Sequence, residues 1–248
     1  MRNKTGSEPV DLTSRTPQEP RRQKEGSGRV KIEIWSDVVC PWCYIGQGRI
    51  TRALQEFEHA AEVEITWRSY QLNPDMPPGQ AVPTLDYLAG RFGPQAKAMV
   101  SRVAELAAAE GLAFDYDASL AVNTMDAHRA LHLAADLGLA DAAQERLFRA
   151  HFAEGADLSD PDTLATLLGE VGVPADRVRA LLASTQYADA VRADIDQANA
   201  FGAGGVPFFV IDRRYGISGA QPVETFLHAL RTAYADQHAA VGPDSAAD

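Results

Sequence analysis

Residues 36–44, with the sequence SDVVCPWCY, decide how the rest of the chain is interpreted. They contain the only two cysteines of the 248-residue chain, Cys40 and Cys43, separated by two residues. Residues 30–35 in front of them alternate apolar and polar side chains, which is typical of a β-strand. Residues 45–57 behind them carry apolar side chains at near-helical spacing. The C-x-x-C motif is therefore predicted where a strand ends and a helix begins.

This position favours redox chemistry. A helix N-terminus carries partial positive charge, which favours a thiolate over a thiol. In a C-x-x-C motif that begins a helix, we expect the first cysteine to be exposed and the second to face inward. Cys40 is therefore predicted to be the nucleophile and Cys43 the resolving thiol. Pro41 would form the first helical turn, and Trp42 would add an apolar wall without charge.

Other roles for this segment stay open at this point. The cysteines could be a reduced structural pair, or they could bind zinc, which would need two further ligands. Asp37, just before the motif, could transfer protons to and from Cys43, or it could cap the predicted helix.

The bulk composition is that of a soluble globular protein. The chain is 46% hydrophobic and 23% charged, with a formal net charge of −11. An acidic surface argues against nucleic-acid binding and against docking on an anionic membrane. No apolar run approaches the roughly 18 residues of a membrane helix. Without a recognisable secretory signal, we expect a cytoplasmic monomer or homodimer, and a C-x-x-C pair that is redox-active or metal-binding rather than structural.

The two ends of the chain differ from its middle. Residues 1–29 are rich in charged residues and proline and poor in large apolar side chains, so we expect a disordered extension. Residues 241–248 are expected to form a flexible tail.

Two parts of the chain together predict a thioredoxin-like fold. Apolar and polar residues alternate at 62–68, so a second strand follows the first helix, and the two strands of this β-α-β unit should be parallel. Near the C-terminus, residues 206–211 and 215–218 are typical of a β-hairpin, and a helix is predicted at 222–238. The fold class is α/β: a four-stranded mixed sheet in the order β-α-β … β-β-α, with helices packed on it.

The two parts comprise residues 30–83 and 203–240, and an insertion lies between them at residues 84–202. A proline-rich connector at residues 70–83 precedes it. We find no convincing strand in the insertion, and its glycine and proline positions divide it into helices. These helices are predicted at residues 84–92, 94–110, 123–137, 139–154, 161–171, 175–182 and 185–201. The insertion is therefore expected to be all-helical.

The sequence GAGGVPF at residues 202–208 is the second part of the predicted site. The fold places the strand that follows it beside the C-x-x-C motif. We expect a cis bond between Val206 and Pro207, which would turn the backbone of Val206 outward to pair with an extended partner peptide. The alternative is an ordinary trans proline on an edge strand.

Five stretches of the chain resemble the DsbA family, in its cytoplasmic FrnE-like branch. They are DVVCPWCYIG at 37–46, NTMDAHR at 123–129, LFRAHFAEG at 147–155, GGVPFFV at 204–210 and YGISGAQ at 215–221. The resemblance implies a thioredoxin fold with a helical insertion, a redox-active pair of Cys40 and Cys43, and a cis Pro207. It implies a protein-disulfide oxidoreductase that exchanges disulfides with protein or small-molecule thiols and needs no organic cofactor or metal.

Relatives of this branch include 2-hydroxychromene-2-carboxylate isomerases and kappa-class glutathione transferases. These usually carry serine at the position of Cys40 and use glutathione, so the two cysteines here favour dithiol chemistry. A glutathione-dependent isomerase or transferase acting on an aromatic or polyketide intermediate is the enzymatic alternative, with glutathione as co-substrate. A metal-binding or docking module is the non-enzymatic one. Some FrnE-like proteins carry a second, C-terminal cysteine pair, which this chain lacks.

Two polar residues of the insertion are further candidates. The resemblance places Asn123 and His128 on a helical lid over the redox pair, where His128 would line the substrate cleft or stabilise the thiolate of Cys40. The structural alternative is that Asn123 caps a helix and that His128 is a packed or solvated helix residue. For the other histidines, including His151, we expect a structural role.

Overall fold

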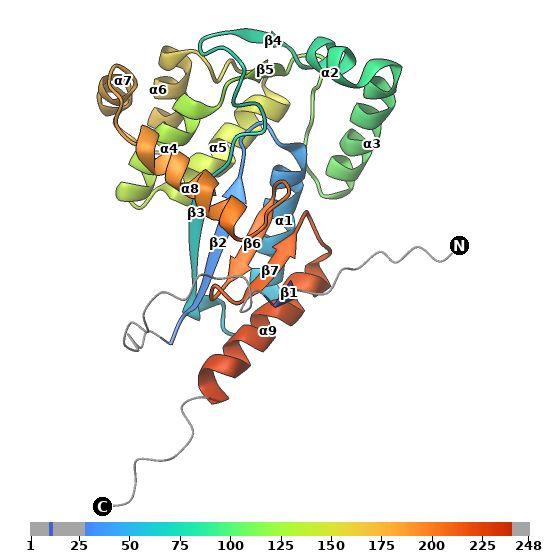
Figure 1. Cartoon of the computed structure of the whole chain (residues 1–248), viewed down its shortest axis with the longest axis vertical. Helices are drawn as coiled ribbons and strands as arrows, with labels where there is room; N and C mark the ends of the chain where they lie inside the picture. The colour runs from blue at the N-terminus through green and yellow to red at the C-terminus, as the bar shows by residue number, and fades with distance from the viewer. Residues whose placement is uncertain (1–9, 12–27, 240–248) are drawn as a thin grey trace, which may run out of the picture.

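A mixed β-sheet forms the centre of the molecule (Figure 1). This computed structural model describes residues 10–11 and 28–239. The strands lie in the order β1-β7-β6-β2-β3. Their bounds are β1 Val10–Asp11, β2 Val30–Ser36, β3 Val63–Ser69, β6 Phe208–Ile211 and β7 Tyr215–Ser218. Strands β2 and β3 are parallel, and the other neighbours are antiparallel. The predicted four-stranded mixed sheet is thus confirmed, with β1 as a short addition at one edge.

The strand β1 lies within the segment predicted to be disordered. Val10 pairs with Gly216 and Asp11 with Tyr215, so the prediction for residues 1–29 does not hold at these two positions. A strand of two residues is too short to show alternation in the sequence, and it forms against an edge strand that comes about 200 residues later. The other predictions for the ends of the chain fall on residues 1–9, 12–27 and 240–248, which lie outside the described residues.

Two helices cover one face of the sheet, and a third lies against the other. Helices α1 (Pro41–Glu56) and α9 (Val223–Ala239) pack together over the side chains of Ile32 and Ile34 from β2. On the opposite face, Trp35 packs with Phe201 and Phe208, next to α8 (Ala188–Ala200). Because both of its faces are covered, β2 is almost wholly buried, as a central strand should be.

The insertion has its own hydrophobic core, formed mainly by α4 to α7. Figure 1 shows α2 and α3 standing apart from these helices. The bounds are α2 Thr84–Phe92, α3 Ala96–Ala109, α4 Met125–Asp136, α5 Ala140–Ala153, α6 Pro161–Glu170 and α7 Ala175–Leu182, with short 3-10 turns at Ala60–Glu62 and Gly93–Gln95. No helix in the described part of the chain is long and apolar enough to cross a membrane.

The prediction of an all-helical insertion is wrong at one place. Strand β5 (Leu120–Val122) pairs with β4 (Ala81–Pro83) in a separate two-stranded antiparallel sheet. Three residues are too few to show alternation, and a proline ends β4, so both segments resemble loops in the sequence. The N–H of Thr84 donates to the carbonyl of Ser119 at 3.0 Å, which extends the pairing to the start of α2.

Candidate active site

Cys40 stands immediately before the first turn of α1. Its backbone is extended (φ −90°, ψ 113°), and Pro41 follows as the first helical residue, where a missing N–H has no cost. The Cys40 carbonyl accepts hydrogen bonds from the N–H groups of Cys43 at 3.0 Å and Tyr44 at 3.3 Å. No side chain in the described part of the chain caps this helix. The positive end of the helix dipole therefore lies beside Cys40, as predicted from the sequence.

Both cysteines are free thiols, and both are buried. Burial raises the pKa of the Cys43 thiol well above its ordinary value, and the neighbouring Cys40 side chain raises it further. The expectation that Cys40 is exposed is wrong, because only 3% of its surface is accessible. Phe148 and Phe152 of the insertion pack against the pair together with Val206. These residues lie more than 100 positions away in the chain, so no local pattern could show the cover.

The second predicted part of the site lies where the sequence analysis expects it. The bond between Val206 and Pro207 is cis. The Cys40 thiol donates to the Val206 carbonyl at 3.5 Å, across 166 positions of sequence. Gly46 in α1 makes the close approach to Pro207 possible, because a Cβ atom there would lie 3.0 Å from Cγ of Pro207 and 3.3 Å from the ring of Phe209.

Asp37 is completely buried, and it does not cap α1. One of its carboxylate oxygens accepts the N–H of Leu72 at 2.8 Å, and the other lies 3.3 Å from Nε2 of His128. The alternative of a helix-capping Asp37 is therefore wrong. His128 is buried as well and is held against Asp37. The two residues bring a carboxylate and an imidazole together close behind the redox pair.

Asn123 joins the start of α4 to the connector between β3 and β4. Its side-chain oxygen accepts hydrogen bonds from the N–H of Met125 at 2.9 Å and from Gln71 at 3.1 Å. Its amide nitrogen donates to the carbonyls of Pro74 at 3.3 Å and Met76 at 2.6 Å. All of these contacts are structural, and they include the expected contact with the first turn of the helix.

His151, for which the sequence predicts a structural role, is buried near Asp37. Burial lowers the pKa of this imidazole to about 4, although the nearby Asp37 carboxylate opposes the effect. The ring is therefore neutral near pH 7, and its Nδ1 atom has no hydrogen-bond partner among the described residues. His151 belongs to one of the stretches that carry the family resemblance, which is the signal that could have drawn attention to it.

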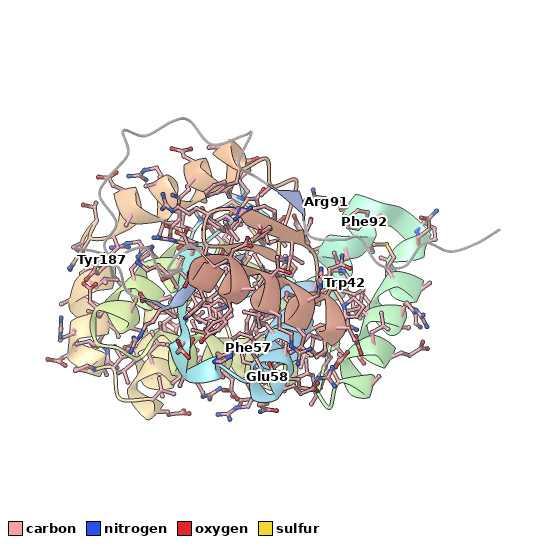
Figure 2. The ribbon with its side chains drawn as sticks, turned by 90° about the horizontal axis from the view of Figure 1, so that it is seen from below. Trp42, Phe57, Glu58, Arg91, Phe92 and Tyr187 are labelled. Atoms are coloured by element: carbon pink, nitrogen blue, oxygen red, sulfur yellow. The ribbon has the colours of Figure 1, made fainter. Side chains whose placement is uncertain are left out.

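A cavity of about 280 Å³ lies beside the exposed end of the redox motif. Its lining is formed by Val39, Pro41, Trp42, Leu72, Asn73, Thr84, Tyr87, Leu88, Arg91, Phe92, Met99, Val100, Val103, Tyr116, Ala121, His151 and Phe152. The four large apolar side chains that are exposed in the described part of the chain, Trp42, Leu72, Phe92 and Met99, all belong to this lining. Figure 2 shows Trp42 and Phe92 on the same side of the molecule, next to α2 and α3. We call this space the α2–α3 cavity.

The described residues offer no group of three or more His, Cys, Asp or Glu side chains placed to hold a metal ion. The zinc site considered as an alternative would need two ligands besides the cysteines. Aromatic and aliphatic side chains, Tyr44, Phe148, Phe152 and Val206, pack against the cysteine pair.

Residues 31–231 match the model of the DSBA-like thioredoxin domain. The chain belongs to this family. Among DSBA-like proteins of known structure, it is 42% identical to a probable DsbA oxidoreductase from Streptomyces coelicolor, with a TM-score of 0.80 over 84% of this chain and 91% of that one. It is 26% identical over 204 residues to the Bacillus subtilis protein YwbO, which covers 81% of this chain and 96% of YwbO.

A third relative shares the fold at lower identity. The cytosolic disulfide reductase DsbM from Pseudomonas aeruginosa is 20% identical, with a TM-score of 0.55 over 85% of this chain and 98% of that one. The likeness covers most of both chains and concerns the fold alone. Together with the family match, it confirms the predicted DSBA-like fold.

Proposed function

We propose that the protein is a cytoplasmic thiol–disulfide oxidoreductase in which Cys40 attacks and Cys43 resolves. The observation that carries this proposal is the position of the Cys40 thiol, at the start of α1 and 3.5 Å from the Val206 carbonyl. A helix N-terminus favours the reactive thiolate. The adjoining backbone of Val206 offers a docking edge for an extended substrate. The match to the DSBA-like family supports the same class of chemistry.

The reaction transfers two electrons from the dithiol to a disulfide. The Cys40 thiolate attacks one sulfur of the substrate disulfide, breaks its S–S bond and releases the first thiol. Cys43 then loses its proton and attacks the sulfur of Cys40, which releases the second thiol and leaves a bond between Cys40 and Cys43. Oxidation of a substrate dithiol follows the same steps in reverse.

The raised pKa of Cys43 fits its place in this sequence. A buried neutral thiol does not compete with Cys40 for the first attack, and it becomes the nucleophile only when the mixed disulfide has formed beside it. Its proton then needs an acceptor in a region closed to water. We assign this role to the Asp37 carboxylate, with His128 as its hydrogen-bond partner at 3.3 Å.

Glutathione is the small thiol that we propose as co-substrate. DsbM, a cytosolic disulfide reductase, has been solved with glutathione, and it shares the fold of this chain. Two glutathione molecules would reduce the bond between Cys40 and Cys43 by the same exchange steps and leave as glutathione disulfide. Protein disulfides and other small disulfides would then be the electron acceptors.

Matched serine variants of the two cysteines test this proposal. Cys40→Ser should abolish reduction of an insulin disulfide in the presence of glutathione, whereas Cys43→Ser should accumulate a mixed disulfide at Cys40 that mass spectrometry detects. Full activity of Cys40→Ser would overturn the mechanism. If that variant instead kept glutathione-dependent turnover of an aromatic compound, the isomerase or transferase alternative would replace it.

A further inference from the structure

Arg91 is the only charged side chain among the described residues that line the α2–α3 cavity. His151, which also belongs to the lining, is neutral near pH 7. Most arginines in the described part of the chain pair with a carboxylate, as Arg102 does with Glu105 in α3. Arg91 has no such partner among the described residues. Its Nη1 atom lies 3.1 Å from Oδ1 of Asn73 and 3.2 Å from the hydroxyl of Tyr87, and both groups are neutral.

Among the described residues Arg91 has no carboxylate partner, although the formal net charge of the chain is −11. Arg91 lies in the last turn of α2, where the helix dipole favours a positive charge, and its guanidinium stands 5.7 Å from the ring centroid of Phe92. These contacts hold the side chain in place but leave its charge unpaired. An arginine has five N–H donors, and the contacts to Asn73 and Tyr87 use only one of its nitrogen atoms. The remaining donors are suited to a carboxylate.

The rest of the lining selects an apolar partner. Large apolar side chains gathered on one exposed surface commonly mark a binding site. Trp42, Phe92 and Met99 belong to the lining and are each at least 40% exposed, and Figure 2 shows Arg91 beside Phe92 on the side of the molecule where Trp42 lies. A volume of about 280 Å³ suits a small molecule rather than a folded partner.

Two buried polar side chains of the lining are unsatisfied. Neither Oγ1 of Thr84 nor Nδ1 of His151 has a hydrogen-bond partner in the part of the chain that the structure describes. Both residues are at least nine-tenths buried. A buried polar atom without a partner destabilises the native state, and a bound polar group is one way to remove that cost. This second observation points to a ligand independently of the charge of Arg91.

We propose that the α2–α3 cavity binds small aromatic carboxylates, with the ring between the apolar walls and the carboxylate on Arg91. Because Pro41 and Trp42 of the redox motif form part of the wall, a disulfide that carries such a group is held next to Cys40. The assignment of this ligand as a substrate rests on the proposed function, whereas its binding does not. The substrate class is therefore aromatic disulfides that bear a carboxylate.

The reaction of such a substrate balances without another reagent. The Cys40 thiolate attacks the disulfide sulfur and releases one aromatic thiol, and Cys43 then displaces the second. The two electrons of the Cys40–Cys43 dithiol pass to the substrate, and its two protons end on the released thiols or in solvent. The enzyme is left with one intramolecular disulfide.

Calorimetric binding to the full chain tests the proposal without any redox step. The probes are naphthoate and its neutral analogue naphthalenemethanol, and the variants are Arg91→Gln and the matched control Arg102→Gln. Naphthoate should bind the wild type more tightly than the alcohol. Arg91→Gln should weaken the binding of naphthoate roughly fivefold, as expected for loss of an exposed ion pair, and should leave the binding of the alcohol unchanged. Arg102→Gln should change the affinity for neither probe. Equal affinity of the two probes, no binding, or equal effects of the two variants would overturn the proposal.

Two further experiments complete the test: a substitution that fills the cavity, and a comparison of a charged with an uncharged disulfide substrate. Val103→Phe adds volume at the wall and should remove binding of both probes while the thermal midpoint shows that the protein is folded; retained binding would place the probes elsewhere and overturn the proposal. In the reduced enzyme, Arg91→Gln should lower the rate of reaction with dithiobis(nitrobenzoate) roughly fivefold. The rate with the uncharged dithiodipyridine should not change. If naphthoate binds as predicted but Cys40→Ser still reduces both disulfides, the proposed function fails and the binding site stands.

Discussion

The redox pair lies between two walls that differ in construction. The wall from the thioredoxin-like part is closely packed, and it presents backbone: α1 approaches Pro207 at Gly46, and the Val206 carbonyl accepts the Cys40 thiol. The wall from the insertion presents side chains, a cavity and a cation, Arg91, that has no carboxylate partner among the described residues. The first wall contacts the reacting sulfur through a backbone carbonyl, a group that is present whatever the side chain. The second varies with its side chains, so in our account the thioredoxin-like part supplies the chemistry and the insertion selects the substrate.

The largest effect should come from the buried arginine that holds the insertion together. Arg129 donates to the carbonyls of Leu181, Ser184 and Gln186 and also pairs with Asp126. Replacing it with methionine leaves three acceptors without this donor, and we expect a loss of about 4 kcal/mol in the free energy of unfolding. Urea denaturation measures this loss.

Arg192→Met is the matched control for that substitution. Arg192 is exposed and pairs only with Asp189 three residues earlier in α8, so the expected change is below about 0.5 kcal/mol. If the two variants lost the same stability, the insertion would not depend on the Arg129 contacts. If Arg129→Met abolished exchange at Cys40 while its stability was unchanged, the division between the two walls would be wrong.

The packing of α1 on Pro207 gives the next prediction. Gly46→Leu forces the helix away from the backbone that contacts Cys40, because even a Cβ atom there would lie 3.0 Å from Pro207. We expect a loss of about 3 kcal/mol in stability and at least tenfold in the rate of disulfide exchange. Gly48→Leu, two residues along the same helix, is the control, because nothing lies within 4 Å of a Cβ atom there. A normal exchange rate in a folded Gly46→Leu variant would contradict the role given to this wall.

The stability of the protein should depend on pH through His151, a residue of the insertion. The pKa of His151 is lowered to about 4 in the native state, whereas an unfolded histidine titrates near 6.5. Between these values the unfolded chain binds a proton that the native state does not, so the native state loses stability as the pH falls from about 6.5 to 4. From pH 7 to pH 4.5 this amounts to about 2 kcal/mol.

His151→Gln should remove that part of the acid sensitivity. Denaturation midpoints at both pH values measure it, and His228→Gln, at an exposed position of α9, should leave the acid sensitivity as it is in the wild type. The same loss between pH 7 and pH 4.5 in His151→Gln and in the wild type would show that His151 is not held neutral.

Local sequence patterns predicted the helices and the long strands well. Helices α2 and α7 and strand β7 have the predicted bounds, because proline, glycine and polar residues mark their ends. Strands β1, β4 and β5 were missed because pairing of two or three residues depends on a distant partner strand. Local propensity is decisive only where an element is long enough to carry a pattern of its own.

In the candidate site, too, local features could be predicted from the sequence and features that depend on distant residues could not. Cys40 and Cys43 at the start of α1 could be predicted because the motif and its flanks are contiguous. The burial of Cys40 could not, because Phe148 and Phe152 reach it from the insertion. That Arg91 has no carboxylate partner in the described part of the chain depends on its neighbours in space, and no sequence pattern contains it. What remained hidden is the part of the site that, in our account, selects the substrate.

The central claim is that the buried Cys40 and Cys43 form an exchangeable disulfide. Equilibration of the protein in glutathione redox buffers, followed by acid quenching and peptide mass mapping, tests this most directly. The account predicts a reversible two-electron transition, with a single bond that joins Cys40 to Cys43 at the oxidising end. Thiols that stay free in an oxidising buffer, or glutathione attached to one cysteine without a bond between the two, would contradict it.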